Sequence, residues 1–173
     1  MIISLLGYMG SGKTHIAKTL SEKLNLEYID LDYYISKKNK MSIAEIFDKK
    51  GEIFFRKQER EALEELFANH NNIILGLGGG TPAYYNNMEV INHNSVSFFL
   101  QASVGLLTER LLQNKEKRPM IARLSNDELP EYIAKHLFER NFYYTKAQFI
   151  ININQKTDIE IADEIINLLD YPS

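Results

Sequence analysis

The chain has 173 residues, 45% of them hydrophobic and 25% charged, which is the balance of a folded globular domain of ordinary size. Its 20 Lys and Arg residues and 23 Asp and Glu residues give a net charge of −3, which argues against binding nucleic acid by phosphate neutralisation. Cysteine is absent, so disulfides and thiolate metal sites are excluded, and no apolar run approaches the roughly 20 residues of a membrane span. We therefore expect one cytoplasmic domain over residues 1–173, with neither a nucleic-acid nor a membrane partner.

Short apolar segments alternate with longer amphipathic ones. Strands are predicted at residues 2–6, 27–30, 72–77, 95–100 and 149–153, and helices at 13–24, 43–67, 104–112, 129–144 and 159–169. Such alternation is typical of an α/β fold with a parallel sheet covered on both faces. Ser42 and Thr157 each begin a capping-box pattern, and Gly51 interrupts the second helical stretch, which favours two helices there. Residues 113–126 are polar and lack apolar periodicity, so we expect a mobile loop.

Residues 7–14, with the sequence GYMGSGKT, match the phosphate-loop pattern G-x-x-x-x-G-K-[ST] in full, between a predicted strand and a predicted helix. Three small residues of this loop are expected to offer backbone N–H groups to a nucleotide phosphate: Gly10, Ser11 and Gly12. Lys13 is expected to reach the β- and γ-phosphates, and Thr14 to ligate Mg²⁺. The pattern indicates binding of a nucleoside triphosphate and leaves the reaction open.

Two aspartates, Asp30 and Asp32, follow the second predicted strand. Ligands of parallel α/β proteins gather at the carboxyl ends of strands, and alternation along an extended chain puts both carboxylates on one side. One carboxylate can then hold Mg²⁺ through water while the other receives a substrate hydroxyl. The structural alternative is that Asp32 is the N-cap of a following helix.

Four further features are candidates for ligand contact, each with a structural alternative. Arg56 can form two parallel hydrogen bonds to a carboxylate, or it can pair with Glu59 on its own helix. Three consecutive glycines, residues 78–80, favour close approach of backbone to a ligand, or a plain flexible turn. Arg118, in the polar segment, can stabilise charge on a transferring phosphoryl group or stay solvated. Arg140 can reach the same site or only favour a helix C-terminus.

Together these features resemble the shikimate kinase family. The resemblance extends from Gly7 to about Tyr143 and rests on motifs in a fixed order. The motifs are the phosphate loop, Asp30-Leu31-Asp32, Gly51-Glu52 with Phe55-Arg56, Gly78-Gly79-Gly80, Arg118-Pro119, and Arg140 with Phe142-Tyr143. The resemblance implies a P-loop fold of the nucleoside-monophosphate-kinase type, with a five-stranded parallel sheet, a substrate-binding region at about 32–62 and a mobile lid at about 113–126. It also implies transfer of the ATP γ-phosphoryl group to the 3-hydroxyl of shikimate, a step in aromatic amino-acid biosynthesis.

The resemblance implies roles for individual residues. Four match residues that hold shikimate in the family: Asp32, Arg56, Gly80 and Arg140. The two arginines would bind the shikimate carboxylate, and Asp32 would accept the hydroxyl proton. Asp30 would order the Mg²⁺ cofactor through water, and Arg118 would contact ATP phosphates. The candidate catalytic residues are Lys13, Asp32 and Arg118, and the expected partners of a monomeric enzyme are ATP and shikimate.

Two other functions remain as alternatives. Another small-molecule kinase, such as a gluconate or nucleotide kinase, gives no reason for two carboxylate-binding arginines beside a triple glycine. A guanine-nucleotide switch needs N-K-x-D, and residues 114–117 read NKEK, with lysine where aspartate is required.

Some positions depart from the family or receive no role. Met120-Ile121 stands where the family has a leucine pair, and Asn141 stands where it often has proline. Arg110 is a candidate for stacking on adenine. The four histidines are scattered without ligand spacing, and none is given a function.

Overall fold

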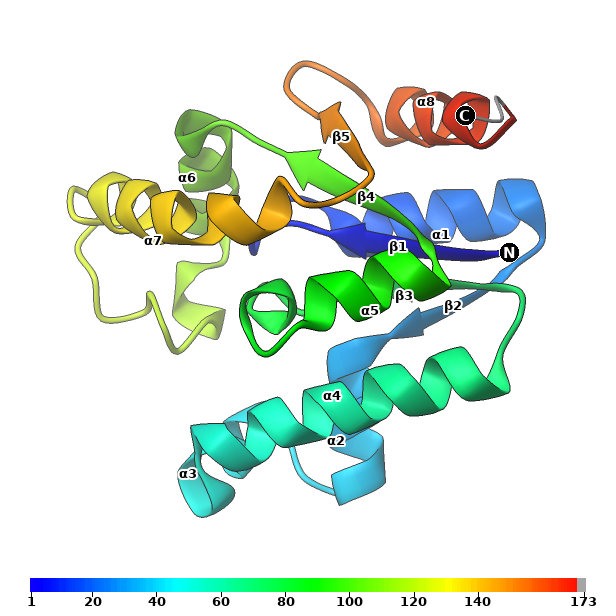
Figure 1. Cartoon of the computed structure of the whole chain (residues 1–173). Helices are drawn as coiled ribbons and strands as arrows, with labels where there is room; N and C mark the ends of the chain where they lie inside the picture. Colours follow the sequence, from blue (N-terminus) through cyan, green and yellow to red (C-terminus); the bar gives the residue numbers. More distant parts are fainter. Residues whose placement is uncertain (171–173) are drawn as a thin grey trace.

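The computed structural model describes residues 1–170, so the last three residues of the expected domain lie outside the described part. Its centre is a parallel sheet of five strands in the order β2-β3-β1-β4-β5 (Figure 1). The strands are β1 (Ile2–Leu6), β2 (Glu27–Asp30), β3 (Ile73–Gly76), β4 (Val96–Gln101) and β5 (Phe149–Asn152). All five predicted strands are confirmed. Every residue of β1 and β3 is buried, which explains their uninterrupted apolar sequences.

Helices cover the sheet on both faces. They are α1 (Lys13–Leu24), α2 (Leu31–Asn39), α3 (Ile43–Lys50), α4 (Glu52–Asn69), α5 (Asn87–Asn94), α6 (Val104–Gln113), α7 (Leu129–Tyr144) and α8 (Asp158–Asp170), with short 3-10 helices η1 (Thr81–Ala83) and η2 (Lys115–Lys117). Helices α1 and α8 pack together on one face, and α5 lies on the other (Figure 1). Helices α6 and α7 pack against each other near the carboxyl ends of the strands, at the left of Figure 1.

The helix ends follow the predicted capping signals. The Ser42 hydroxyl accepts a hydrogen bond from the Glu45 N–H at 3.1 Å. Thr157 and Glu160 cap α8 reciprocally, with distances of 3.2 and 2.7 Å. Gly51 has φ +86° and separates α3 from α4, so the predicted break is confirmed. Helices α2 and α5 escaped sequence-based detection because they are short, and α2 buries only Leu31 and Ile35.

Residues 113–126 contain more local structure than their polar sequence predicted. They contain η2, and the Lys115 ammonium donates to the Leu124 carbonyl at 2.6 Å and to Asn126 Oδ1 at 2.9 Å. Ile121 is completely buried in the main hydrophobic core. A single anchoring side chain produces no periodicity, so the sequence pattern could not reveal it. The mobility of this segment stays a prediction.

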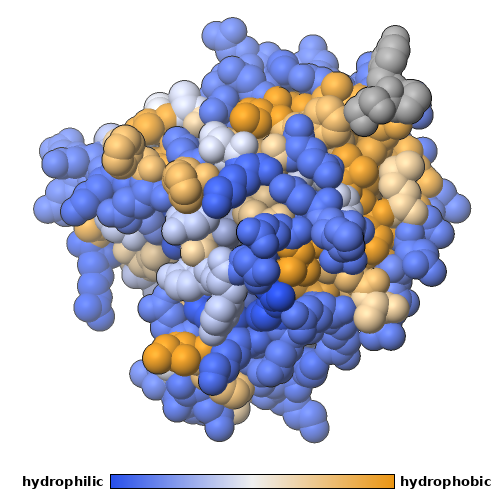
Figure 2. Space-filling view, viewed as in Figure 1, coloured by the Kyte–Doolittle hydropathy of each residue, from blue (hydrophilic) through white to orange (hydrophobic). Residues whose placement is uncertain are grey.

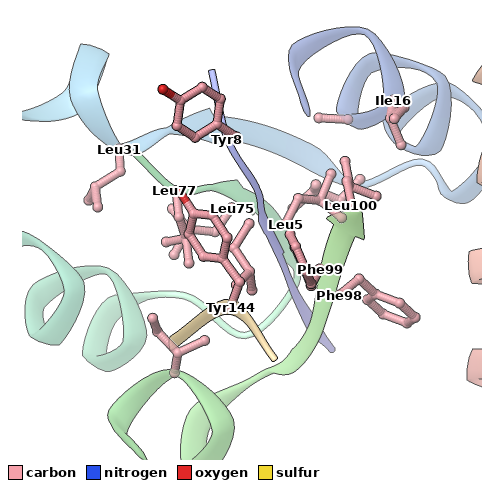
Figure 3. Packing of buried hydrophobic residues seen from close by; sticks show 14 of the residues in the cluster. Leu5, Tyr8, Ile16, Leu31, Leu75, Leu77, Phe98, Phe99, Leu100 and Tyr144 are labelled. Atoms are coloured by element: carbon pink, nitrogen blue, oxygen red, sulfur yellow. The ribbon is translucent and has the colours of Figure 1, made fainter. Parts of the chain in front are cut away.

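The packing of the core brings the phosphate loop and the triple glycine together at the carboxyl ends of the strands. Figure 3 shows Leu5, Leu75 and Phe99, from three neighbouring strands, in the buried cluster. The Tyr144 ring of α7 lies with its centre 5.0 Å from that of Phe99. The phosphate loop follows β1 and the triple glycine follows its neighbour β3, and the Leu77 N–H donates to the Leu5 carbonyl at 3.0 Å. The face seen in Figure 2 is mostly hydrophilic, with apolar residues surfacing mainly between α5 and α8. Among residues 1–170, no helix combines the length and apolarity needed to cross a membrane.

Candidate active site

The phosphate loop wraps around the ammonium of its own lysine. Gly10 and Gly12 have φ values of +82° and +88°, in the left-handed region that glycine enters at little cost. Lys13 Nζ donates to the Gly7 carbonyl at 2.7 Å and to the Tyr8 carbonyl at 3.2 Å. Burial lowers the pKa of Lys13 to about 8, although Asp32 and Asp30 oppose the shift. The lysine therefore remains mostly protonated at neutral pH, at the positive end of α1.

A cavity of about 700 Å³ opens beside this loop, and we call it the phosphate-loop cavity. Its lining includes Thr14, Asp30, Asp32, Gly78, Arg110 and Arg118. Arg110 Nη1 also donates to the Gly10 carbonyl at 3.2 Å, so this side chain lies against the loop. Its stacking on adenine stays a prediction.

The two aspartates reach this cavity by a different route from the expected one. Strand β2 ends at Asp30, whose Oδ1 accepts the Tyr33 N–H at 2.9 Å and caps α2. Asp32 lies in the first turn of α2, so the prediction of side chains alternating along an extended strand was wrong. The alternative that made Asp32 the N-cap was also wrong, because Asp30 is the cap. The strand-to-helix turn between them still leaves both residues at the cavity.

Asp32 lies where two cavities meet, because it lines the phosphate-loop cavity and also a second one. Its Oδ1 is buried and has no hydrogen-bond partner among the described residues. Burial raises the pKa of Asp32 to about 6, helped by Asp30 and Glu59 and opposed by Lys13 and Arg56. A carboxylate with an unused oxygen and such a pKa is suited to accept a proton near neutral pH.

The second cavity, of about 660 Å³, contains the other predicted contact residues and is called the arginine cavity. Asp32, Arg56, Gly80 and Arg140 all line it. A Cβ on Gly80 would lie 2.7 Å from Arg56 Nη1 and 3.1 Å from Arg140 Nη1. Both guanidinium groups therefore converge over this glycine, and the third glycine of the triplet is required by their close approach.

Each converging arginine is fixed by protein partners. Arg56 Nη1 donates to Glu59 Oε1 at 2.6 Å, and Glu59 is only 1% exposed. The Arg56 guanidinium carbon lies 3.9 Å from the centre of the Tyr84 ring, a favourable cation–π distance. Arg140 Nη1 donates to the Gly79 carbonyl at 2.5 Å. The predicted pairing of Arg56 with Glu59 is therefore present, and it leaves Arg56 at the cavity. Its binding of a ligand carboxylate stays a prediction.

Sequence reasoning missed the supporting residues of this cavity. Glu59 entered only as a competing partner, yet it also accepts a hydrogen bond from the Thr81 hydroxyl at 2.5 Å. The i, i+3 spacing to Arg56 was the available signal. Tyr84 gave no local signal, because its contact with Arg56 spans 28 positions of the chain, from 56 to 84.

Replacing Gly80 with alanine is expected to lower kcat/KM for the acceptor by about 10²-fold, the cost of misplacing a reacting group by about 1 Å. The added methyl would displace guanidinium groups that Glu59 and Gly79 hold in place. Steady-state kinetics checks this. Gly105→Ala is the matched control, because its Cβ would meet nothing closer than 3.9 Å. Equal effects of the two variants would contradict the prediction.

Arg118, like Asp32, lies where the two cavities meet. It lines both, and its carbonyl accepts hydrogen bonds from the N–H groups of Ile121 and Ala122 at 3.1 and 2.9 Å. The buried Ile121 therefore anchors the turn that carries this arginine. Its position beside both cavities suits a group that binds phosphate during transfer.

No cluster of three or more His, Asp or Glu side chains suited to a metal ion occurs among residues 1–170. Thr14 and Asp30 do line one cavity, and this sparse oxygen set fits Mg²⁺, which usually keeps waters and takes ligands from phosphates. A phosphate loop at one cavity and two converging arginines in the adjoining cavity, on a five-stranded parallel sheet, define a P-loop protein with room for a second, anionic ligand beside the nucleotide.

Comparison with known proteins identifies the family within this class. The sequence model of the family described as shikimate kinase matches residues 9–170. The chain belongs to the shikimate kinase family. A shikimate kinase of Flavobacterium psychrophilum is 46% identical over 168 residues, covering 96% of this chain and 98% of that protein. One of Flavobacterium johnsoniae is also 46% identical, with the same coverage.

Solved structures agree with this assignment. A shikimate kinase of Bacteroides thetaiotaomicron superposes with a TM-score of 0.92 at 36% identity and covers 99% of both chains. A shikimate kinase of Acinetobacter baumannii in complex with shikimate gives a TM-score of 0.87 at 30% identity, covering 97% of this chain and 92% of that one. The expected fold, a five-stranded parallel sheet flanked by helices, is confirmed.

Proposed function

We propose that this protein transfers the γ-phosphoryl group of ATP to the 3-hydroxyl of shikimate, giving shikimate 3-phosphate and ADP in the biosynthesis of chorismate and aromatic amino acids. The observation that carries the proposal is the position of Asp32 at the junction of the phosphate-loop and arginine cavities. A phosphoryl donor and an alcohol acceptor bound in the two cavities would meet at this carboxylate. Family membership supports the choice of acceptor.

The arginine cavity suits a small hydroxylated carboxylic acid. Arg56 and Arg140 converge from separate helices, so together they can bind one carboxylate through several charge-assisted hydrogen bonds. Gly80 brings backbone close to the same point, and Asp32 can accept hydrogen bonds from acceptor hydroxyls. Shikimate, with one carboxylate and three hydroxyls, uses all of these groups.

The transfer step needs positioning and charge neutralisation more than strong base catalysis. The oxygen of the 3-hydroxyl forms a bond to the γ-phosphorus, and Asp32 accepts the proton that this hydroxyl loses. The bond from that phosphorus to the β–γ bridging oxygen breaks, and ADP takes the electron pair. Lys13 and Arg118 stabilise the charge on the transferring group, while backbone N–H groups of Gly10, Ser11 and Gly12 hold the phosphates. Closure of the lid segment, residues 113–126, excludes water from the bound substrates.

Thr14 and Asp30 are the residues we propose for Mg²⁺, the first through its hydroxyl and the second through water. A cation held there with ATP would neutralise negative charge on the phosphates. Asp30 is held by two donors, the Tyr33 N–H and the Tyr28 hydroxyl at 3.2 Å, so its carboxylate is already oriented toward the cavity edge. We also propose a monomer, since one chain supplies every proposed contact, acting in the cytoplasm where ATP is available.

A substrate panel tests the acceptor. With Mg-ATP as donor, we expect ADP release to depend on shikimate and to remain at background with gluconate or a nucleoside monophosphate. Family membership supports this choice. The panel is needed because gluconate and nucleoside monophosphates also carry anionic groups that two arginines can bind. Turnover of gluconate without turnover of shikimate would overturn the proposal, and a strong preference for GTP would revive the nucleotide-switch alternative.

Arg140→Ala is expected to weaken shikimate binding by about 1.5–3 kcal/mol, or about 10- to 150-fold, the range for a hydrogen bond to a charged group. Arg140→Lys should recover only part of this loss, because lysine keeps the charge and lacks the planar fork. Isothermal titration calorimetry checks both variants. Lys135→Ala is the control, because this exposed residue lies on the same helix. Unchanged shikimate affinity in Arg140→Ala would reject the proposed contact.

A further inference from the structure

The phosphate loop is joined to α7 by a side-chain contact that the proposed reaction does not use. Tyr8, the second residue of the loop, is 3% exposed, and its hydroxyl lies 2.9 Å from His136 Nδ1 on α7. The two rings meet edge to face with centroids 5.3 Å apart. Both residues also line the arginine cavity. The sequence assigned no role to His136, because its partner lies 128 positions away.

Both partners of this hydrogen bond are favoured in their uncharged forms. Burial raises the pKa of the Tyr8 hydroxyl, so it remains protonated at neutral pH. Burial and the nearby Arg140 lower the pKa of His136, which favours the neutral imidazole. The hydrogen bond therefore joins two neutral groups, and the tautomer of His136 decides which of them donates.

His136 belongs to a row of side chains that connects α7 with both active-site loops. His136, Arg140 and Tyr144 follow one another at intervals of four residues, so they share one face of the helix. Arg140 and Tyr144 both donate to the Gly79 carbonyl at 2.5 Å. His136 binds Tyr8, whose backbone carbonyl in turn accepts a hydrogen bond from Lys13. One helix face therefore contacts the phosphate loop and the triple glycine together.

We propose that Tyr8 and His136 are positioning residues, which hold α7, and with it Arg140, in a fixed relation to the phosphate loop. Ordering of the loop by bound nucleotide then steadies the arginine that binds the acceptor. Nucleotide binding and acceptor binding are then coupled. Each ligand changes the affinity for the other by the same factor, because such coupling is reciprocal. This deepens the function proposed above and rests on it for the identity of the acceptor.

Kinetics of matched variants provides the first test. Tyr8→Phe removes only the hydroxyl, and we expect the KM for shikimate to rise about 2- to 30-fold, the range for residues that couple two sites, with a smaller change in kcat. His136→Leu should have the same effect, and the double variant should add little to either, because each removes the same bond. His136→Asn keeps an acceptor near the Nδ1 position and should recover part of the loss. Tyr132→Phe is the control, because this ring also packs on His136, with centroids 5.5 Å apart.

Hydrogen exchange provides a second test that does not involve shikimate. We expect Mg-ADP to slow amide exchange in α7 of the unaltered protein and of Tyr132→Phe, and to leave α7 unchanged in Tyr8→Phe and His136→Leu. Protection of α7 in the unaltered protein without turnover of shikimate would refute the proposed function and still support the coupling. The coupling is overturned if Mg-ADP fails to protect α7 in the unaltered protein. It is equally overturned if Tyr8→Phe retains both the protection and the original KM.

Discussion

Lys13→Ala is expected to reduce kcat by at least about 10²- to 10³-fold, the loss associated with removing one preorganised group that stabilises transition-state charge. Lys13 is the residue around which the phosphate loop folds, through bonds of 2.7 and 3.2 Å to the Gly7 and Tyr8 carbonyls. Lys13 is the only basic residue among residues 7–14, so no other side chain of the loop can supply its positive charge. A coupled assay of ADP release at saturating Mg-ATP and shikimate measures the effect.

The control for this variant is Lys18→Ala, which removes an exposed lysine from the same helix. It should keep the original kcat. Thermal unfolding of both variants separates loss of chemistry from loss of fold. A Lys13→Ala protein that folds and turns over at a near-normal rate would count decisively against the proposed ATP site.

Asp32→Asn is expected to reduce kcat by about 10²- to 10⁴-fold, the usual contribution of a positioned general base, while the KM for ATP changes little. Asparagine keeps the size of the side chain and cannot accept the proton of the acceptor hydroxyl. Single-turnover kinetics at saturating substrates measures the chemical step directly. Asp48→Asn, an exposed position on α3, is the matched control. A larger effect on ATP binding than on catalysis would contradict the assignment.

The pH dependence of the unaltered enzyme tests the same residue. Asp32 must be ionised to accept a proton, and burial raises its pKa to about 6. We therefore expect kcat/KM for shikimate to fall as the pH drops through about 6, and to be insensitive to this group well above that value. A profile that stays flat down to pH values near the ordinary aspartate pKa of about 4 would remove Asp32 from the role of base.

Sequence reasoning succeeded where the determining interactions are local. The phosphate loop, the reciprocal cap at Thr157 and the break at Gly51 each depend on residues within a few positions of one another. The alternating pattern also predicted the parallel sheet, because buried strands such as β1 and β3 have continuous apolar sequences.

It failed where contacts join distant segments. Asp30 and Asp32 were placed at one site by an argument from strand alternation, whereas a helix that begins at Leu31 brings them there. The reason for Gly80 is the approach of Arg56 and Arg140 from two other helices, and no local pattern encodes it. Likewise Tyr8 and His136 have no signal in isolation, and only the packing of α7 against the phosphate loop joins them.

Phosphorus NMR of the reaction mixture tests the central claim most directly. The protein is incubated with Mg-ATP and shikimate, and the products are followed by their phosphorus resonances. Spin–spin coupling between the new ester phosphorus and the proton on carbon 3 of shikimate identifies the hydroxyl that was phosphorylated. We predict ADP and shikimate 3-phosphate in equal amounts. Release of ADP and inorganic phosphate without a phosphoester, or a phosphoester at another hydroxyl, would contradict the account.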